Sequence, residues 1–163
     1  MKGHLCAGLV ISLFSINSFA ATVTVKGTVI LPTCTIKSSS SVIQVNFGDD
    51  VITTRIDGKE YKKQKIEYSI QCDGDMSSNS GLQISISGSP ASFDSSLLKT
   101  NVTGLGVRFL NGSNNLSLNS GSAKFDYIND TPPTIYAVLA RDASVTLASG
   151  AFSASAMMSV DYQ

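Results

Sequence analysis

Strict alternation of apolar and polar residues recurs through most of the chain, and it constrains the fold more than any other feature. Side chains of a β-strand point alternately to its two faces, so a two-residue period predicts strands with one buried face. The pattern is clearest over residues 23–31, 43–47, 66–72, 82–86 and 152–162, with turn-forming clusters between them. No stretch of ten or more residues has the period of a helix. We therefore predict an all-β fold.

Three further strands are predicted on other grounds. Residues 107–109 alternate and are followed by Asn111 and Gly112, a pair that favours a tight hairpin turn, so residues 116–118 are expected to pair back. Residues 134–141 are almost continuously apolar, as in a strand buried on both faces. Seven or eight short strands in one chain of 163 residues predict an immunoglobulin-like sandwich.

The first twenty residues have the features of a signal peptide. Lys2 and His4 give a basic start, and residues 5–16 form a mostly apolar run that is too short for a membrane span. Small residues at Ser18 and Ala20 suit signal peptidase, which predicts cleavage after Ala20. No other stretch approaches eighteen apolar residues, so we expect no membrane span.

The composition removes much of enzyme chemistry. The one histidine of the chain is His4, so the cleaved chain has no imidazole base, no Ser-His triad and no histidine-ligated metal. The formal net charge is zero, which does not favour nucleic acid as a partner. We therefore expect no enzymatic activity, no catalytic or metal-binding residues and no cofactor.

Cleavage would also remove Cys6, which leaves Cys34 and Cys72 as the cysteines of an exported chain. Oxidising compartments favour a disulfide between them. A metal pair or a redox motif fits less well, because the chain has no CxxC motif and no second cysteine pair. The bridge would close a loop of about 39 residues and stabilise the fold by roughly 4 kcal/mol.

The two ends of the chain do not fit a self-contained sandwich. The last predicted strand runs to Tyr162, one residue from the end, and no sequence remains to cover its free side. The stretch 23–31 is a spare apolar strand, set off from Cys34 by Pro32. Because an exposed apolar edge strand promotes aggregation, we expect the first strand of each subunit to cover the open edge of the next. Head-to-tail contacts of this kind build filaments if they do not close into a ring.

These features together resemble the subunits of chaperone–usher fimbriae, the pilins of Gram-negative bacteria. The resemblance rests on an alternating extension with Gly27 at its middle, on Cys34 close behind it and on Cys72 at the end of a strand. It also rests on Gly150, fourteenth from the end, and on the penultimate Tyr162. It implies an incomplete immunoglobulin-like Greek-key sandwich that lacks its last strand, which a neighbouring subunit completes with a donor strand.

The resemblance also implies partners and a division of the chain. A periplasmic chaperone would lend a strand to the groove and contact the terminal carboxylate of Gln163. At the outer-membrane usher, the extension of an incoming subunit would replace that strand. The expected parts are a signal peptide (1–20), an N-terminal donor-strand extension (21–33) and an incomplete immunoglobulin-like domain (34–163).

Two sets of site residues follow from the same resemblance. The expected donor strand inserts Val23, Val25, Gly27, Val29 and Leu31. The expected edge strand of the groove, which contacts chaperone or donor, comprises Gly150, Phe152, Ala154, Ala156, Met158, Val160, Tyr162 and Gln163. Gly27 is either a weak point in a strand or a position where the groove is filled from beneath, and its register with four apolar residues favours the second interpretation.

The predicted function is that of a structural fimbrial subunit, exported to the periplasm and then built into a cell-surface fimbrium that supports adhesion. General resemblance favours a minor or adaptor subunit over the main shaft. The alternative is a tip adhesin or a secreted lectin-like domain. Tip adhesins of this family usually have two domains and lack the extension, whereas this chain has one domain and the extension. The absence of Trp also argues against sugar binding.

Overall fold

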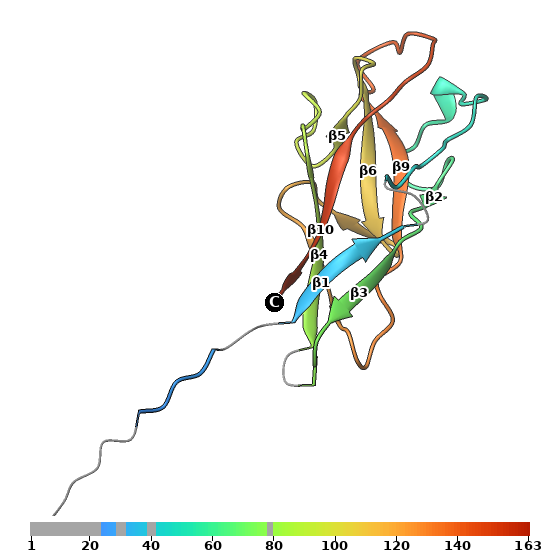
Figure 1. The fold of residues 1–163 in the computed structure, drawn as a ribbon. Coiled ribbons are helices and arrows are strands. Elements are labelled where there is room, and N and C mark those ends of the chain that lie inside the picture. The colour runs from blue at the N-terminus through green and yellow to red at the C-terminus, as the bar shows by residue number, and fades with distance from the viewer. Residues whose placement is uncertain (1–23, 29–31, 39–41, 78–79) are drawn as a thin grey trace, which may run out of the picture. The chain divides into compact units, whose positions relative to one another are not determined.

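The structure, a computed structural model, describes residues 24–28, 32–38, 42–77 and 80–163. The chain divides into two units, Met1–Ile30 and Leu31–Gln163. In the first unit, residues 24–28 belong to no helix or strand, and all five are exposed. In the described part of the second unit, the regular elements are β-strands apart from one short 3-10 turn (Figure 1).

The described part of the second unit contains ten strands and one short 3-10 turn, Thr53–Arg55. The strands are β1 (Thr33–Lys37), β2 (Gln64–Lys65), β3 (Ser69–Asp73), β4 (Gly81–Gly88), β5 (Leu98–Lys99), β6 (Leu105–Asn111), β7 (Asn114–Leu116), β8 (Ser122–Asp126), β9 (Ile135–Arg141) and β10 (Ala156–Tyr162). The predicted all-β class is confirmed.

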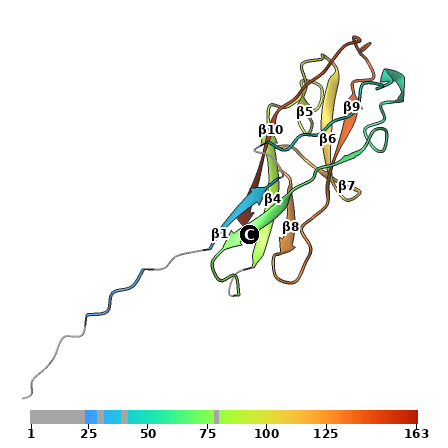
Figure 2. The ribbon, with the colours of Figure 1, turned by 45° about the vertical axis from the view of Figure 1, so that its right-hand side comes forward.

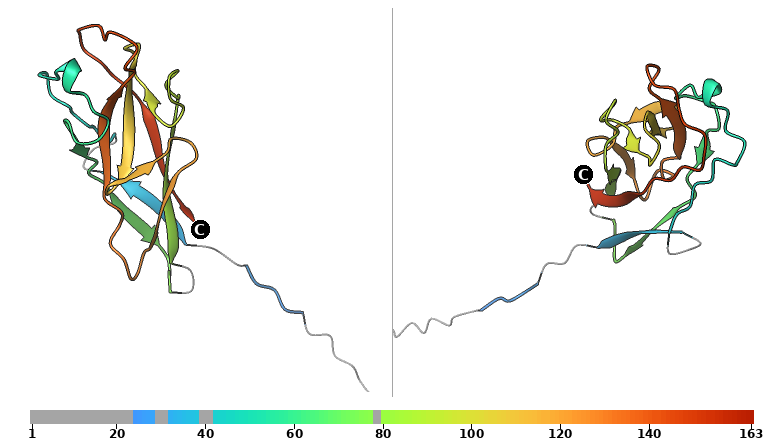
Figure 3. Two further views of the ribbon diagram at one scale, coloured as in Figure 1. Left: turned by 180° about the vertical axis from the view of Figure 1, so that it is seen from behind. Right: turned by 90° about the horizontal axis from the view of Figure 1, so that it is seen from above.

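The strands form three antiparallel sheets. The largest has the order β2-β9-β6-β5, with β7 paired to β6, and it faces a sheet of order β10-β4-β8 (Figure 3). Figure 2 shows β8 beside β4, at the edge opposite β10. The third sheet consists of β1 and β3. Since β10 is an edge strand, its ladder continues on one side only.

The core lies between the two larger sheets, where the alternating faces meet. In β4, Leu82, Ile84 and Ile86 are 0–3% exposed, and they pack in one cluster with Phe109 of β6 and Leu139 of β9. β9 is buried along most of its length, as its continuous apolar sequence predicts. At roughly 1.5–3 kcal/mol for each fully buried large apolar side chain, these strands provide much of the favourable term in folding.

The predicted hairpin after β6 is present, but its return strand is β7, Asn114–Leu116, rather than residues 116–118. Asn111 pairs with Asn114 across a two-residue turn, and Gly112 at the turn has a φ of +61°. An L-residue rarely adopts this conformation, whereas glycine adopts it without a Cβ clash, which explains the Asn-Gly sequence here.

The predicted strand over residues 66–72 is interrupted in the structure. β2 ends at Lys65 and pairs with β9, whereas β3 begins at Ser69 and pairs with β1. The alternation continues across the break, because Ile66 is buried and Tyr68 and Ile70 are half-buried. The chain therefore crosses from one sheet to another without losing its inward-facing pattern, and the sequence alone did not reveal this crossing.

The predicted disulfide is present and links the two strands of the smallest sheet, β1 and β3. Cys34 and Cys72 lie opposite each other in the β1-β3 ladder, and their Sγ atoms are 2.09 Å apart. In the described part of the chain, no helix has both the length and the apolar character needed to span a membrane.

Candidate functional site

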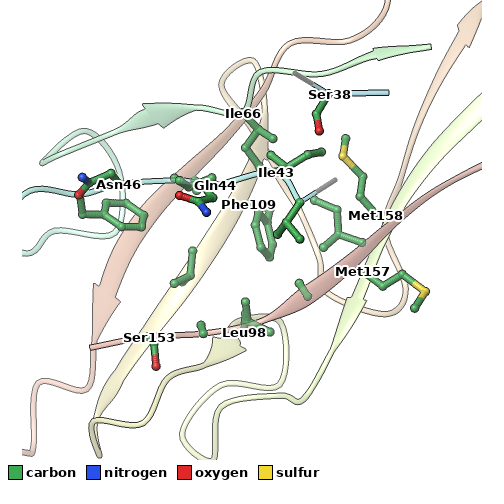
Figure 4. Close-up of a pocket in the computed structure, with 18 of the residues that line it drawn as sticks. Ser38, Ile43, Gln44, Asn46, Ile66, Leu98, Phe109, Ser153, Met157 and Met158 are labelled. Carbon is green, nitrogen blue, oxygen red and sulfur yellow. The ribbon is translucent and has the colours of Figure 1, made fainter. Parts of the chain in front are cut away.

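An open apolar groove runs between two segments of the second unit. We call residues 42–47 the first lip and residues 150–158 the second lip. The larger part of the groove has a volume of about 930 Å³. Figure 4 shows Ile43, Gln44 and Asn46 along the first lip and Met157 and Met158 along the second, with Phe109 between the two segments. The floor is the core itself, through Ile66, Ile86, Leu98, Val107, Phe109 and Ala137.

The first lip has the side-chain pattern of a strand but no partner strand. Ile43 and Val45 are half-buried, Phe47 is 8% exposed, and Gln44 and Asn46 point outward. The alternation therefore supports the predicted strand over 43–47, yet this segment belongs to no ladder. Among the described residues, Ile43, Gln44 and Val45 find no hydrogen-bond partner. A strand laid in the groove would supply those bonds.

The second lip is paired only over its last residues. The predicted strand over 152–162 starts later than expected, because the β10 ladder begins with Ala156 opposite Gly88. Ahead of it, Asn101 holds Ser153 through two hydrogen bonds. The main-chain N–H of Asn101 donates to the Ser153 carbonyl at 3.2 Å, and the Ser153 N–H donates to the Asn101 Oδ1 at 2.7 Å. The main-chain groups of Phe152 and Ala154 make no hydrogen bond within the described part of the chain.

Two aromatic rings meet across the groove and separate it into a larger and a smaller part. Phe47 of the first lip and Phe152 of the second lip have ring centroids 5.9 Å apart and planes inclined by 45°. Both rings line the larger part, and both also line a smaller part of about 560 Å³ that continues toward Gly150. The groove therefore has two compartments, with an aromatic contact between the lips at their junction.

The groove carries almost no charge. Lys37 is the one charged residue lining the larger part, and Asp49 is the one lining the smaller part, counted over the described residues. The remaining lining is apolar or uncharged polar. Such a surface selects an occupant by apolar side chains and main-chain hydrogen bonds.

The shifted pKa values belong to aspartates that accept hydrogen bonds in loops and turns and to one partly buried tyrosine. Hydrogen bonds from the Ser80 hydroxyl and then from the Asn129 N–H lower the pKa of Asp126, and the Ser144 hydroxyl does the same for Asp142. Burial raises the pKa of Tyr68 to about 12, and its hydroxyl donates to the Pro133 carbonyl. No cluster of three or more potential metal-ligating side chains occurs among the residues described.

The predicted edge-strand residues fall into two groups. Met158, Val160 and Tyr162 pack against the core, and Phe152 does so through its ring. Ala154 and Ala156 are exposed and line the larger compartment, while Gly150, with a φ of +140°, lines the smaller one. Gln163 follows β10, and its side-chain amide donates to the carbonyls of Leu82 in β4 and Phe125 in β8 at 2.9 and 3.2 Å.

Two of the five predicted donor positions lie within the described residues. Val25 is 88% exposed, and a Cβ added at Gly27 would meet no atom within 4 Å. Val23, Val29 and Leu31 lie outside the described residues.

Sequence reasoning missed two parts of the groove. It identified 43–47 as a strand but not as the first lip, although the alternation was visible there. It also missed Asn101, since nothing in a lone asparagine 52 residues ahead of Ser153 signals a contact with the second lip.

Comparison with known proteins agrees with this architecture. The sequence profile of the fimbrial protein family matches residues 23–163. The uncharacterized fimbrial-like protein YfcR of Escherichia coli (strain K12) is 33% identical over 134 residues, which is 81% of this chain and 74% of YfcR. The uncharacterized fimbrial-like protein YfcQ of the same strain is 30% identical over 147 residues, 86% of each chain.

Solved structures share the fold. The P pilus rod subunit PapA matches with a TM-score of 0.62 and 21% identity, over 88% of this chain and all of PapA. The P pilus adaptor subunit PapF matches with a TM-score of 0.55 and 24% identity, over 80% of this chain and 95% of PapF. The chain therefore belongs to the fimbrial protein family, as a structural, non-enzymatic subunit of a chaperone–usher pilus with the incomplete immunoglobulin-like fold of such subunits.

Proposed function

We propose that the groove accepts a donor strand from a neighbouring subunit and that the extension over residues 21–33 supplies the strand this chain donates in turn. One observation carries the proposal: the groove exposes an apolar floor between two lips, and several main-chain groups along the lips make no hydrogen bond within the described part of the chain. They belong to Ile43, Gln44, Val45, Phe152 and Ala154. A strand placed there would bond to the lips through its backbone and cover the floor with alternate side chains. It would also cover the free side of β10, which otherwise offers an open edge.

The length and chemistry of the extension match the groove. Strand residues rise about 3.4 Å each, so Val25 to Leu31 span about 20 Å. The second lip takes the same six steps from Phe152 to Met158, both of which line the larger compartment. In this arrangement the apolar face of the extension points to the floor, and Lys26 points to solvent.

Gly27 gives the sharpest test of this register. We expect a peptide of residues 21–32 that carries Gly27→Leu to displace an existing groove occupant at least about fivefold more slowly than the native peptide. Leucine would place four more heavy atoms against a packed floor, and overpacking of this kind costs roughly 1–3 kcal/mol. The measurement is the rate at which each peptide displaces a fluorescent native peptide from the subunit.

The matched control for this experiment is the adjacent, outward-facing position. Lys26→Ala should leave the displacement rate within about twofold of native, because it removes no side chain that enters the groove. Equal rates for the native and Gly27→Leu peptides would show that the register is wrong.

Asn101 should matter for binding, although it lies outside the groove lining. Asn101→Ala removes the side-chain oxygen that accepts from the Ser153 N–H, so the second lip loses one of its two anchors. One such hydrogen bond contributes about 1 kcal/mol, which predicts about fivefold weaker binding of the native peptide. Asn115→Ala, at an exposed position of β7, is the control. Unchanged affinity for Asn101→Ala would remove this residue from the account of the site.

We further propose how the subunit reaches its place. Residues 1–20 are a signal peptide, 21–33 the donor-strand extension and 34–163 the receiving domain. A periplasmic chaperone fills the groove before assembly, and the extension of another subunit replaces it at the outer-membrane usher. Exported chain should begin at Ala21, which N-terminal sequencing of the periplasmic protein checks.

We infer that this subunit occupies a minor or adaptor position in a surface fimbrium that supports adhesion. The inference rests on the general resemblance of the sequence. The fold does not distinguish the two positions, because a rod subunit and an adaptor subunit both share it. Immunogold labelling of fimbriae distinguishes the two positions. A minor subunit gives one or a few sites per fibre, and a shaft subunit gives continuous labelling.

A further inference from the structure

The root of the N-terminal extension is held by the folded domain from two sides. The Tyr162 hydroxyl, at the end of β10, donates to the Pro32 carbonyl at 2.7 Å. On the other side, a Cβ at Gly74 would lie 3.3–3.4 Å from atoms of Pro32, so the bare α-carbon of Gly74 packs against the proline. We call Pro32, Gly74, Met76 and Tyr162 the Pro32 clasp.

Each member of the clasp is itself fixed. Gly74 has a φ of +108°, a conformation that favours glycine, and it follows β3, which the disulfide joins to β1. The Met76 sulfur lies 3.4 Å from the Tyr162 hydroxyl as a weaker second acceptor, and Met76 is 6% exposed. Tyr162 is the last residue of the β10 ladder and pairs with Leu82. The clasp thus ties the β1-β3 sheet to the β10-β4-β8 sheet.

The position of the clasp leaves no slack behind the donor strand. Leu31 is the last donor position, and Pro32 follows it directly. The proline ring fixes its own φ, and it also restricts the residue before it to extended conformations. When the extension of a donating subunit lies in the groove of its neighbour, no freely rotating residue separates that strand from the Pro32 clasp of the donating subunit.

We propose that Tyr162 is a positioning residue that fixes the root of the extension, so that a donating subunit meets its neighbour at one defined angle. This inference rests on the proposed donor-strand function. It assigns Tyr162 a role on the donor side of the joint, distinct from its place in the edge strand on the acceptor side.

The test uses a two-subunit complex of chains that begin at Ala21. The donor has the native extension and its own groove is filled by native peptide 21–32, whereas the acceptor carries Gly27→Leu so that it donates more slowly. Each subunit has one nitroxide label at an exposed position of β8, through Lys124→Cys. Double electron–electron resonance then measures the spread of distances across the joint.

Tyr162→Phe is placed in the donor alone. It removes the hydrogen bond to Pro32 but keeps the ring, and we expect the distance distribution to widen at least twofold. Ser159→Ala in the donor removes another β10 hydroxyl, which contacts Ser85, and it should leave the width unchanged.

Three results would overturn the proposal: a broad distribution in the wild-type complex, no widening by Tyr162→Phe in the donor, or equal widening by Ser159→Ala. Failure of the proposed function has a different signature, because native peptide 21–32 would then not bind the groove at all.

Discussion

Removal of the disulfide is expected to lower the free energy of unfolding by roughly 4 kcal/mol. Cys34→Ser with Cys72→Ser frees a loop whose ends are 38 residues apart in sequence, which increases the conformational entropy of the unfolded chain. The folded state suffers as well, because β1 and β3 form a two-stranded sheet, which is marginal by itself. The measurement is urea unfolding of both proteins with the native 21–32 peptide at saturation.

A neighbouring substitution provides the control for this loss. Thr35→Ala changes an exposed position of β1 whose hydroxyl makes only a long, 3.4 Å hydrogen bond, and it should shift stability by about 0.5 kcal/mol or less. If the oxidised protein and the double serine variant unfold at the same urea concentration, the bridge does not stabilise this fold.

Occupation of the groove is expected to have an effect of similar size. The chain from Ala21 without a partner should aggregate, because its lips and floor remain open and its own extension inserts into other copies. At a peptide concentration of about a thousand times the dissociation constant, the native 21–32 peptide should stabilise the domain by about 4 kcal/mol. The shift in thermal midpoint, followed by circular dichroism, measures this effect.

A peptide with Val25→Asp and Val29→Asp serves as the control. It keeps the backbone of the donor strand but would bury two carboxylates against an apolar floor, so it should give no stabilisation. A chain that is monomeric and unfolds cooperatively without any partner would contradict the proposal that the fold needs a donated strand.

The sequence predicted the parts of the fold in which local pattern and final environment agree. Alternation located β4, continuous apolarity located β9, and the Asn111-Gly112 pair located the hairpin to β7. The first lip shows where this reasoning stops. Its alternation predicted a strand, and the side chains obey the pattern, but a ladder also requires a partner that the described residues do not supply.

The remaining features depend on contacts between distant parts of the chain. Tyr162 and Pro32 are 130 residues apart, and Asn101 and Ser153 are 52 apart. A single hydrogen bond leaves no periodic trace in the sequence, so neither pair was predictable. The break between β2 and β3 was hidden for a related reason, since the inward-facing pattern continues while the pairing partner changes.

The near absence of charge along the groove affects how the joints between subunits would respond to the salt concentration around a fibre. Dissolved ions weaken attraction between charged groups, and they have far less influence on main-chain hydrogen bonds and on contacts between apolar side chains. With Lys37 and Asp49 as the charged residues of the described lining, the joints would hold as well in fresh water as in brine. If the subunits join through this groove as proposed, a fibre outside the cell would need no separate device to keep its subunits together when the salt concentration changes.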